Sequence, residues 1–338
     1  MKSVVLERPG VVSLSEAEQL HPGPWQAVVR LRLNGICGSD LAAYRGTAPQ
    51  VAYPCVLGHE LLVDVLECPD RPELEGGRAV VEPLVFCGSC RACRVGRYNC
   101  CAHLKVLGVQ IDGGLREVNV VDARRLYPVP EGMPDETAVL AEPTSIAYHA
   151  VQRSQVEAGQ VAVIFGAGTI GLLIAQILTR GRGCRALVVD LDPWRLGVAE
   201  RMGATPLQGR REELIRAVRG ATGGEMADVV FEATGSPVCT RMTTDLVAHA
   251  GKIVLIGWNP SPVEVDTVTL MRKEVDLLGS RTSVGAFPYV LRLLEDEVVD
   301  SQSLITHHFD LGDTASALKL LDEGNEGALK ILIDGRQA

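Results

Sequence analysis

The sequence lacks a basic tail and any long block of Lys or Arg, and its formal net charge is −9. Nucleic acids and anionic membrane surfaces are therefore poor candidates as partners. Internal repeats and low-complexity linkers are also missing. The first residues turn charged before an apolar signal region can form. We therefore expect no secretion signal and a cytoplasmic location.

Nothing else in the composition is unusual for a soluble globular protein. Hydrophobic residues make up 46% and charged residues 22% of the 338 residues, which is enough for one or two domains with full cores. The apolar segment 161–178 is about as long as a membrane span. Because it carries three regularly spaced glycines, we interpret it as a strand followed by a helix.

Five of the ten cysteines lie between residues 87 and 101. In a reducing compartment such a cluster indicates a metal site more than disulfides. A structural zinc ion needs four ligands, and the spacing of Cys87, Cys90 and Cys93 allows them to surround one ion. The fourth ligand is Cys100 or Cys101, and spacing does not choose between them. We expect the isolated cysteines to be small buried side chains: Cys55, Cys68, Cys184 and Cys239.

The chain has two regions that differ in their sequence pattern. Residues 1–140 carry short alternating runs that predict a β-rich region, with strands at 25–35, 60–67 and 78–83. From about residue 145, predicted strands alternate with helices, which indicates a parallel sheet covered on both faces and an α/β fold class. These strands are expected at 161–165, 186–190, 228–235, 252–257 and 275–280, with helices at 169–180 and 193–203.

The three glycines of the apolar segment are typical of a dinucleotide-binding turn. Gly166, Gly168 and Gly171 follow a predicted strand and open a predicted helix, and Asp190 closes the next strand nineteen residues later. Such a turn lets the backbone approach a pyrophosphate at a helix N-terminus. Asp190 would accept hydrogen bonds from a ribose diol and repel a 2′-phosphate. The pattern therefore predicts NAD in preference to NADP.

Other residues near these predicted strand ends complete the expected cofactor site. Arg195 follows Asp190 closely enough to help position the adenosine end. The remaining predicted cofactor-binding residues are Thr169, Ile170, Thr234 and Gly257. The alternatives are a glycine-rich turn in a core hairpin or a membrane span, and neither predicts Asp190 or the strands that follow.

The β-rich half carries residue types that suit a catalytic zinc ion. Such an ion takes about three protein ligands and keeps one position open. Cys37 follows a predicted strand, and His59 and Glu60 begin the next, while Glu142 lies near the junction of the two regions. Taken singly, His59 could be a core histidine and Glu142 a helix-capping carboxylate. Their separation along the chain does not predict that they converge.

The motifs GICGSD, GHE, CGSCRACRVGRYNCC, GGLREV, AEPTSIAYHA and GAGTIG resemble the zinc-containing medium-chain dehydrogenase/reductase family over nearly the whole chain. The resemblance implies a GroES-like catalytic domain at 1–145 with a structural-zinc lobe at 86–102. It further implies a Rossmann domain with a doubly wound parallel sheet at 146–286 and a C-terminal return to the catalytic domain at 287–338.

The resemblance also implies roles for individual residues. It places Cys101 on the structural zinc and leaves Cys100 as a spacer. It gives Cys37 and His59 to the catalytic zinc, with Glu142 as the third ligand. For Glu60 it leaves three alternatives: Glu60 replaces Glu142 as a zinc ligand, alternates with it, or binds the zinc through water.

The same resemblance implies a route for the proton of the alcohol. Ser39 occupies the position whose hydroxyl takes that proton. Many relatives carry a histidine three residues later, and this chain has Ala42 there. The proton must therefore leave by water, a ribose hydroxyl or another side chain. Arg281, just after a predicted sheet strand, is a candidate for the substrate site.

The implied activity is the NAD-dependent interconversion of a secondary alcohol and its ketone by an enzyme with two zinc ions per chain. Within the family, the chain most resembles sugar-acid dehydrogenases of the L-galactonate and L-gulonate 5-dehydrogenase type. Polyol (sorbitol-type) and threonine dehydrogenases share many of its motifs. The resemblance implies a homodimer or homotetramer. Two other classes stay open: an NAD(H)-sensing regulator on the same fold, and an interaction module built on a zinc ribbon.

Overall fold

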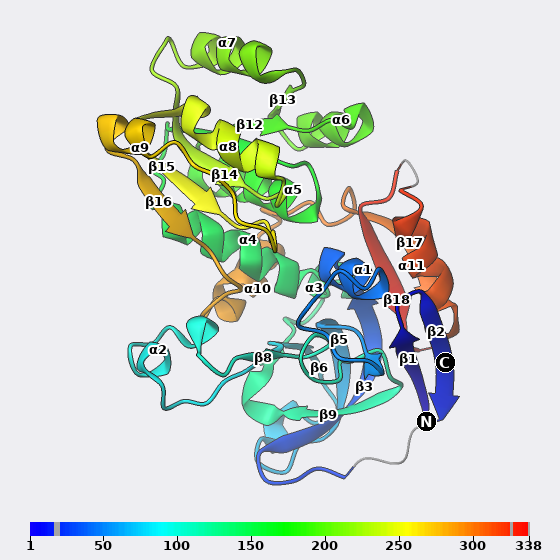
Figure 1. Cartoon of the computed structure of the whole chain (residues 1–338). Helices are drawn as coiled ribbons and strands as arrows, with labels where there is room; N and C mark the ends of the chain where they lie inside the picture. Colours follow the sequence, from blue (N-terminus) through cyan, green and yellow to red (C-terminus); the bar gives the residue numbers. More distant parts are fainter. Residues whose placement is uncertain (17–20, 325–326, 337–338) are drawn as a thin grey trace. The chain divides into compact units, whose positions relative to one another are not determined.

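The computed structural model describes residues 1–16, 21–324 and 327–336, which form two compact units (Figure 1). Unit 1 contains residues 1–142, 287–295 and 301–338, and unit 2 contains 143–286 and 296–300. The first boundary thus falls three residues before the expected one, and 296–300 cluster with unit 2. None of the helices in the described ranges combines the length and apolarity that crossing a bilayer requires.

The main sheet of unit 1 has the strand order β10-β6-β5-β3-β18-β17, and β9 also pairs with β3. The three strands expected in this half all form. The strands of this sheet are β3 (Gln26–Gly35), β5 (Glu60–Glu67), β6 (Arg78–Val81), β9 (Val118–Asp122), β10 (Leu126–Pro128), β17 (Ile305–Asp310) and β18 (Lys330–Asp334).

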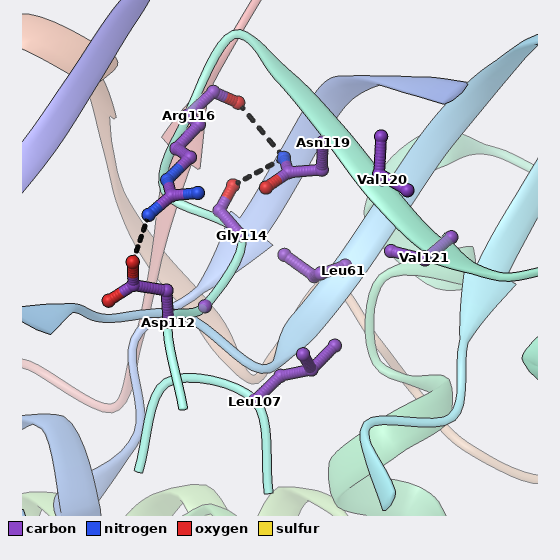
Figure 2. Close-up of a pocket in the computed structure, with 9 residues that line it drawn as sticks. Leu61, Leu107, Asp112, Gly114, Arg116, Asn119, Val120 and Val121 are labelled. Atoms are coloured by element: carbon purple, nitrogen blue, oxygen red, sulfur yellow. Dashed lines mark hydrogen bonds and ion pairs between the residues drawn. The ribbon is translucent and has the colours of Figure 1, made fainter. Parts of the chain in front are cut away.

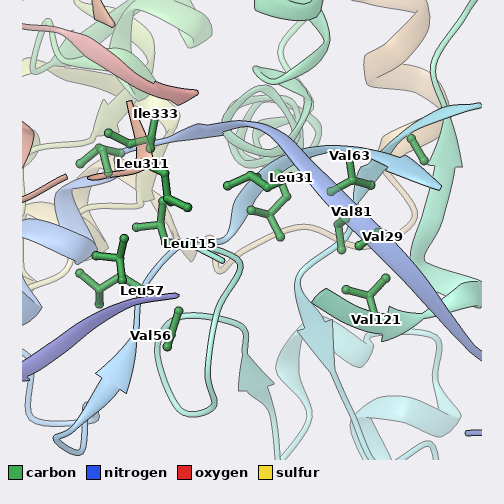
Figure 3. Close-up of a cluster of buried hydrophobic side chains, with 14 of the residues drawn as sticks. Val29, Leu31, Val56, Leu57, Val63, Val81, Leu115, Val121, Leu311 and Ile333 are labelled. Atoms are coloured by element: carbon green, nitrogen blue, oxygen red, sulfur yellow. The ribbon is translucent and has the colours of Figure 1, made fainter. Parts of the chain in front are cut away.

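Alternation along these strands sends one set of side chains into a common core. Val29 and Leu31 on β3 are fully buried, as are Val63 on β5 and Ile333 on β18. Figure 3 shows these side chains gathered between the strands of the unit. Burial of such a continuous apolar face is the main favourable term that holds the strands together.

Two smaller sheets complete the strands of unit 1. One has the order β2-β1-β4, and the other is the pair β7-β8, which brackets the cysteine-rich segment. Their strands are β1 (Lys2–Arg8), β2 (Val11–Glu16), β4 (Cys55–Val56), β7 (Leu84–Val85) and β8 (Lys105–Val106).

Unit 1 also contains short helices that the β-rich expectation did not include. The first, α1 (Gly38–Tyr44), starts directly after β3 and is N-capped by Cys37. The others are α2 (Arg91–Arg94), α3 (Asp135–Ala138), α10 (Phe287–Glu295) and α11 (Thr314–Asp322), with 3-10 turns at Tyr98–Cys100 and Ala123–Arg125. In α1, the Asp40 carboxylate accepts the backbone N–H of Cys37, which satisfies one of the exposed donors at the start of the helix.

Unit 2 is a parallel sheet with the strand order β13-β12-β11-β14-β15-β16. This is the order 3-2-1-4-5-6 of a doubly wound dinucleotide-binding fold, so the predicted fold class is confirmed. The strands are β11 (Val161–Phe165), β12 (Arg185–Val189), β13 (Thr205–Leu207), β14 (Ala227–Glu232), β15 (Val247–Leu255) and β16 (Asp276–Gly279).

The helices of unit 2 fall close to the expected positions. The helix expected at 169–180 is α-helical over α5 (Thr169–Gln176) and π-helical over η4 (Ile177–Gly181). The others are α4 (Ala141–Ser154), whose first two residues belong to unit 1, α6 (Pro193–Arg201), α7 (Arg211–Ala221), α8 (Pro237–Leu246) and α9 (Thr267–Lys273).

The expectation for the isolated cysteines was wrong at two of four positions. Cys68 and Cys184 are buried, whereas Cys55 and Cys239 are only partly so. Cys55 lies on the two-residue strand β4, which pairs with β1 alone, and Cys239 lies in the first turn of α8. Neither position is enclosed by packed elements on all sides.

Candidate metal centres and cofactor site

Three potential metal ligands meet in unit 1. One ligand atom each from Cys37, His59 and Glu60 lies within 4.8 Å of the others. The antiparallel pairing of β3 with β5 explains this, because Gly35 near the end of β3 is opposite Glu60 at the start of β5. Cys37 and Glu60 are far apart in the sequence, and the pairing of β3 with β5 brings them together.

Asp40 organises this cluster, although the sequence analysis gave it no role. Its Oδ2 accepts the N–H of Cys37 at 2.8 Å, and its Oδ1 lies 3.7 Å from Nδ1 of His59. Ser39 Oγ is 3.4 Å from the other ring nitrogen, Nε2. A carboxylate behind a histidine is the usual second-layer support of a metal ligand. The signal was available, since an acid three residues after a helix N-cap is a capping pattern.

Lys330 on β18, close to the C-terminal end of the sequence, contacts Glu60 of this cluster. Its Nζ lies 2.7 Å from both carboxylate oxygens of Glu60 and donates to Ile36 O at 3.0 Å. Glu60 packs so closely that a Cβ on Gly35 would lie 1.9 Å from its Oε2. The carboxylate is therefore held firmly, and glycine is needed at position 35.

Glu142, in the first turn of α4, is buried with 9% of its surface exposed. Burial raises the pKa of Glu142 to about 7, although the nearby His59 opposes this shift. Among the described residues, the set of ligand atoms within 4.8 Å contains Glu60 and does not contain Glu142. The choice between the two carboxylates as the third zinc ligand stays a prediction.

The charges of the cluster suit a divalent cation. Asp40, Glu60 and Glu142 are all buried carboxyl groups, and the Cys37 thiol adjoins them. Lys330 can offset only one of these negative charges. For His59, burial disfavours the charged ring, but Asp40, Cys37 and Glu142 outweigh this and raise its pKa. A thiol, an imidazole and buried carboxyl groups form a donor set that fits zinc.

The second candidate centre is the cysteine lobe, the structural-zinc lobe predicted at residues 86–102. The sulfur atoms of four cysteines lie within 4.8 Å of one another: Cys87, Cys90, Cys93 and Cys101. Cys100 Sγ instead lies 3.8 Å from Arg97 Nη2. The geometry thus selects Cys101 as the fourth member of the group.

Backbone N–H groups in the lobe point at the sulfur atoms. Cys101 Sγ accepts from the N–H groups of Cys87 at 3.4 Å and His103 at 3.3 Å. Hydrogen bonds from the backbone N–H groups of Ser89 and Cys90 lower the pKa of Cys87 to about 5. Thiolates stabilised in this way are the form that binds zinc.

In unit 2, the glycine turn has the geometry that the sequence predicted. Gly166 directly follows β11 with a φ of 101°, and Gly168 is the N-cap of α5. A Cβ on Gly171 would lie 1.8 Å from Gly166 O, so only glycine fits. Thr169 and Ile170 form the first turn of α5, where backbone N–H groups lack helical partners and can bind a phosphate.

Asp190 is tied to the backbone around this turn. Its Oδ2 accepts the Ala167 N–H at 2.6 Å, and its Oδ1 accepts those of Leu191 at 2.7 Å and Asp192 at 3.0 Å. A carboxylate has about four acceptor positions, so it can still accept from a ribose. Arg195 Nε lies 3.4 Å from Asp192 in the first turn of α6.

The loop after β14 is held by a buried acid that the sequence analysis missed. Glu232 accepts the hydroxyl and the N–H of Thr234, the latter at 2.9 Å. Its backbone oxygen accepts the Gly257 N–H at 2.9 Å. Thr234 and Gly257 therefore lie at the carboxyl ends of adjacent strands, the edge where parallel sheets bind ligands.

A pocket of about 830 Å³ opens within unit 2 beside Asp190. Helix α8 forms one wall of the pocket through Val238, Cys239 and Met242, and the loops after β12, β13 and β15 supply residues such as Leu191. This volume is typical of small-molecule sites. Leu191 is 85% exposed, which offers an apolar surface to a planar ring.

A second pocket, in unit 1, is too small for a substrate. Figure 2 shows it beside Asp112, Arg116 and Asn119, with a volume of about 50 Å³. Arg116 pairs with Asp112, and Asn119 Nδ2 donates to the backbone oxygens of Gly114 and Arg116. The space is sufficient for water only.

Arg281 lies on the loop that follows β16 in unit 2, and it is exposed. Ser283, two residues later, is buried and its hydroxyl lies 2.9 Å from that of Ser145 on α4. Thr282 between them has a φ of 42°, which is unusual for a β-branched residue. The loop is therefore fixed on both sides of a residue with a strained backbone, a combination often found at functional sites.

Comparison with known proteins identifies the family. Residues 23–131 match the alcohol dehydrogenase GroES-like domain, and residues 169–296 match the zinc-binding dehydrogenase domain. An uncharacterized zinc-type alcohol dehydrogenase-like protein of Haemophilus influenzae is 36% identical over 98% of both chains. L-galactonate-5-dehydrogenase of Escherichia coli K12 is 31% identical over 93% of both chains.

A solved structure extends the likeness to three dimensions. The short chain alcohol dehydrogenase (rspB) of Escherichia coli CFT073, complexed with NADH, superimposes with a TM-score of 0.93, at 33% identity and 99% coverage of both chains. The chain belongs to the zinc-binding dehydrogenases of the alcohol dehydrogenase type. It is thus a zinc-dependent enzyme of that class, and the predicted family is confirmed.

Proposed function

We propose that the enzyme oxidises a secondary alcohol of a sugar acid to a ketone with NAD, and catalyses the reverse reaction. The observation that carries the proposal is the convergence of partly buried Cys37 with buried His59 and Glu60 within 4.8 Å, with Ser39 beside His59. A regulator or a binding module would not need this set of ligands in addition to the four-cysteine lobe.

Each residue of the Cys37, His59 and Glu60 centre is proposed to have its own role in the reaction. Cys37 and His59, with Glu142 or Glu60, hold the zinc ion, which when bound lowers the pKa of the alcohol and stabilises the alkoxide. Ser39 takes the hydroxyl proton. Asp40 keeps the His59 ring oriented. With NAD bound, the nicotinamide would accept a hydride from the carbinol carbon, so that alcohol and NAD⁺ would become ketone, NADH and a proton.

NAD is proposed as the cofactor on three grounds. The E. coli CFT073 structure with NADH is 33% identical to this chain. Asp190 lies beside the glycine turn and disfavours a 2′-phosphate through charge repulsion. The 830 Å³ pocket next to Leu191 has a suitable size and an apolar wall for the adenosine half of the cofactor.

A sugar acid is proposed as the substrate because of Arg281 and the E. coli relative. The relative, named L-galactonate-5-dehydrogenase, acts on a sugar acid by its name. Arg281 follows a strand of the parallel sheet on the ligand-binding edge. A guanidinium can hold a carboxylate by two parallel hydrogen bonds, which a neutral polyol does not offer.

The experiment that tests the function is a screen for NADH formation over aldonates, neutral polyols and amino alcohols. We expect the highest kcat/KM with an aldonate. A preference for neutral polyols would replace the substrate class with that of sorbitol-type enzymes. No NADH from any secondary alcohol, with zinc bound, would favour an NAD(H)-sensing protein.

The role of Arg281 is tested by Arg281→Lys, which keeps the charge and removes the planar pair of donors. KM for the aldonate should rise roughly tenfold, or about 1.4 kcal/mol when KM approximates Kd. KM for a polyol of the same length should change little. An equal loss for both substrates would assign Arg281 to general active-site structure.

The proposal includes a homodimer or homotetramer in the cytoplasm. The edge strand β16 exposes Leu277, and α9 exposes Val268 and Met271. Edge strands with exposed apolar residues are suited to pairing with another chain. Free cysteines at both metal centres suit a reducing compartment. Light scattering at several concentrations tests the oligomer, and a monomer at all of them would contradict it.

A further inference from the structure

Three polar side chains converge on one buried carboxylate next to the cysteine lobe. Tyr98 OH donates to Glu82 Oε1 at 2.7 Å, while Arg125 Nη1 and Tyr127 OH donate to Oε2 at 2.9 and 3.1 Å. The Glu82 side chain has no exposed surface. A buried carboxylate is costly unless it is paired and hydrogen-bonded, and here both oxygens are satisfied.

The partners of Glu82 come from two different parts of unit 1. Tyr127 lies on β10 of the main sheet and Arg125 directly precedes that strand, where the Glu82 N–H extends the β6–β10 ladder by donating to Arg125 O at 2.9 Å. Tyr98 belongs to the lobe and stacks on Phe86 with ring centroids 4.4 Å apart. The Arg125 guanidinium lies 4.2 Å from the Phe86 ring centroid. Glu82 therefore joins the lobe to the sheet.

The lobe is anchored at its end, where Asn99 and Cys101 are buried, but its first part is exposed. Residues 87–97 include no buried residue, and α2 buries none of its side chains. Its stem is the pair β7–β8, with two residues in each strand. In Figure 1 the loop that carries α2 extends away from these strands. Most of its order must come from the cysteine group and from the contacts of Phe86 and Tyr98.

A short covalent and hydrogen-bonded path leads from Glu82 to the metal ligands. Tyr98 opens the 3-10 turn Tyr98–Cys100, and the N–H of the next residue, Cys101, donates to Tyr98 O at 2.9 Å. Cys101 Sγ lies 3.5 Å from Cys87 Sγ. Fixing the Tyr98 ring thus fixes the backbone that presents Cys101 to the other three sulfurs.

We propose that Glu82 is a positioning residue for the four-cysteine metal site and that it acts through Tyr98. Without this contact, Cys101 is held less firmly relative to Cys87, Cys90 and Cys93, and the site loses its metal more easily. Supports of this kind typically change metal affinity by roughly tenfold to a hundredfold. The inference rests on the proposed metal site of the lobe.

Two tyrosines provide a matched pair of variants for the test. Tyr98→Phe and Tyr127→Phe each remove one hydroxyl donor from Glu82, but only Tyr98 lies in the lobe. The probe is cadmium, whose thiolate absorbance reports occupancy of the cysteine site during a challenge with excess EDTA. We expect Tyr98→Phe to release lobe cadmium roughly tenfold faster than the parent protein, and Tyr127→Phe to remain within about twofold.

The control variant Glu82→Gln keeps the shape of the side chain and removes its charge, so it should release the metal at least as fast as Tyr98→Phe. Equal release by Tyr98→Phe and the parent would overturn the positioning role and leave the metal site intact. Equal acceleration by both tyrosine variants would also overturn it, because the effect would then come from general stability. A parent protein with no cadmium–thiolate absorbance would instead overturn the metal site itself.

Discussion

Lys330 Nζ lies 2.7 Å from each carboxylate oxygen of Glu60, and both side chains are almost fully buried. Replacing Lys330 by Met leaves that carboxylate buried without its partner, which costs about 3–5 kcal/mol. We therefore expect Lys330→Met to lower the free energy of unfolding by this amount in urea titrations at fixed zinc concentration.

An exposed pair provides the control. Lys319 on α11 and Glu323 just after its end are 3.7 Å apart and largely in solvent, so Lys319→Met should change stability by less than about 0.5 kcal/mol. The double variant Lys330→Met/Glu60→Gln should recover part of the loss. Similar small effects from Lys330→Met and Lys319→Met would mean that the buried pair does not hold Glu60 in place.

A network around Asp135 should make stability depend on pH. Asp135 accepts from Arg32, Arg78 and Arg336 at 2.6–3.1 Å. Burial alone would raise the pKa of Asp135, but the hydrogen bonds from Arg32 and Arg78 lower it overall. A carboxyl whose folded-state pKa is depressed stabilises the fold above its unfolded-state pKa, and this stability is lost as the pH falls through the folded-state value.

Asp135→Asn should therefore cost roughly 1–3 kcal/mol at neutral pH, and the difference should shrink at a pH below about 4. Thermal unfolding across that range measures it. Asp122→Asn is the control, because Asp122 pairs with the largely exposed Arg124. A difference between Asp135→Asn and the parent that stays constant down to the lowest pH would contradict the assignment.

Cofactor preference depends on Asp190. Asp190→Ala removes the charge that opposes a 2′-phosphate, so the ratio of kcat/KM for NAD to that for NADP should fall by roughly tenfold, or about 1.4 kcal/mol. Steady-state kinetics with both cofactors measure it. Asp192→Ala is the control in the same loop, since it removes the cap of α6 and should leave the ratio unchanged. A parent enzyme that uses both cofactors equally well would refute this role.

Ala42 stands where the family resemblance implies a histidine that would pass the proton to solvent. It lies on α1, two residues after Asp40, and is half-buried. If proton release limits alcohol oxidation, Ala42→His should raise kcat at the acidic end of the pH–rate profile. Ala42→Gln, similar in size but unable to carry the proton, should not. Superimposable profiles would show that water already carries the proton fast enough.

Sequence reasoning succeeded where a function depends on neighbouring residues. The turn from Gly166 to Gly171 and the strand before it follow from local pattern, as does the group Cys87, Cys90 and Cys93. It could not choose between Cys100 and Cys101 by spacing, because the choice depends on how the turn Tyr98–Cys100 directs the chain.

Sequence reasoning could not predict contacts between distant segments. Lys330 meets Glu60 across 270 positions because β18 returns to pair with β3. No local pattern predicts that a lysine is buried. Glu82 likewise has the sequence pattern of an ordinary strand residue. Helix α1 was missed because its seven residues are too few to show a clear helical period.

The central claim is that the chain holds two zinc ions with separate roles, one for the reaction and one for the lobe. Cys37→Ser should remove the first ion and abolish turnover while the fold persists. Cys93→Ser should instead lower stability, because binding of a structural zinc contributes directly to folding. Cys100→Ser, next to the lobe ligand Cys101, should retain both ions and full activity.

The most direct measurement is the zinc content of purified protein by elemental analysis, with turnover measured on the same sample. The predicted result is two zinc ions per chain in the active parent and one in inactive, folded Cys37→Ser. One zinc per chain in a fully active parent, or undiminished turnover in Cys37→Ser, would contradict the account.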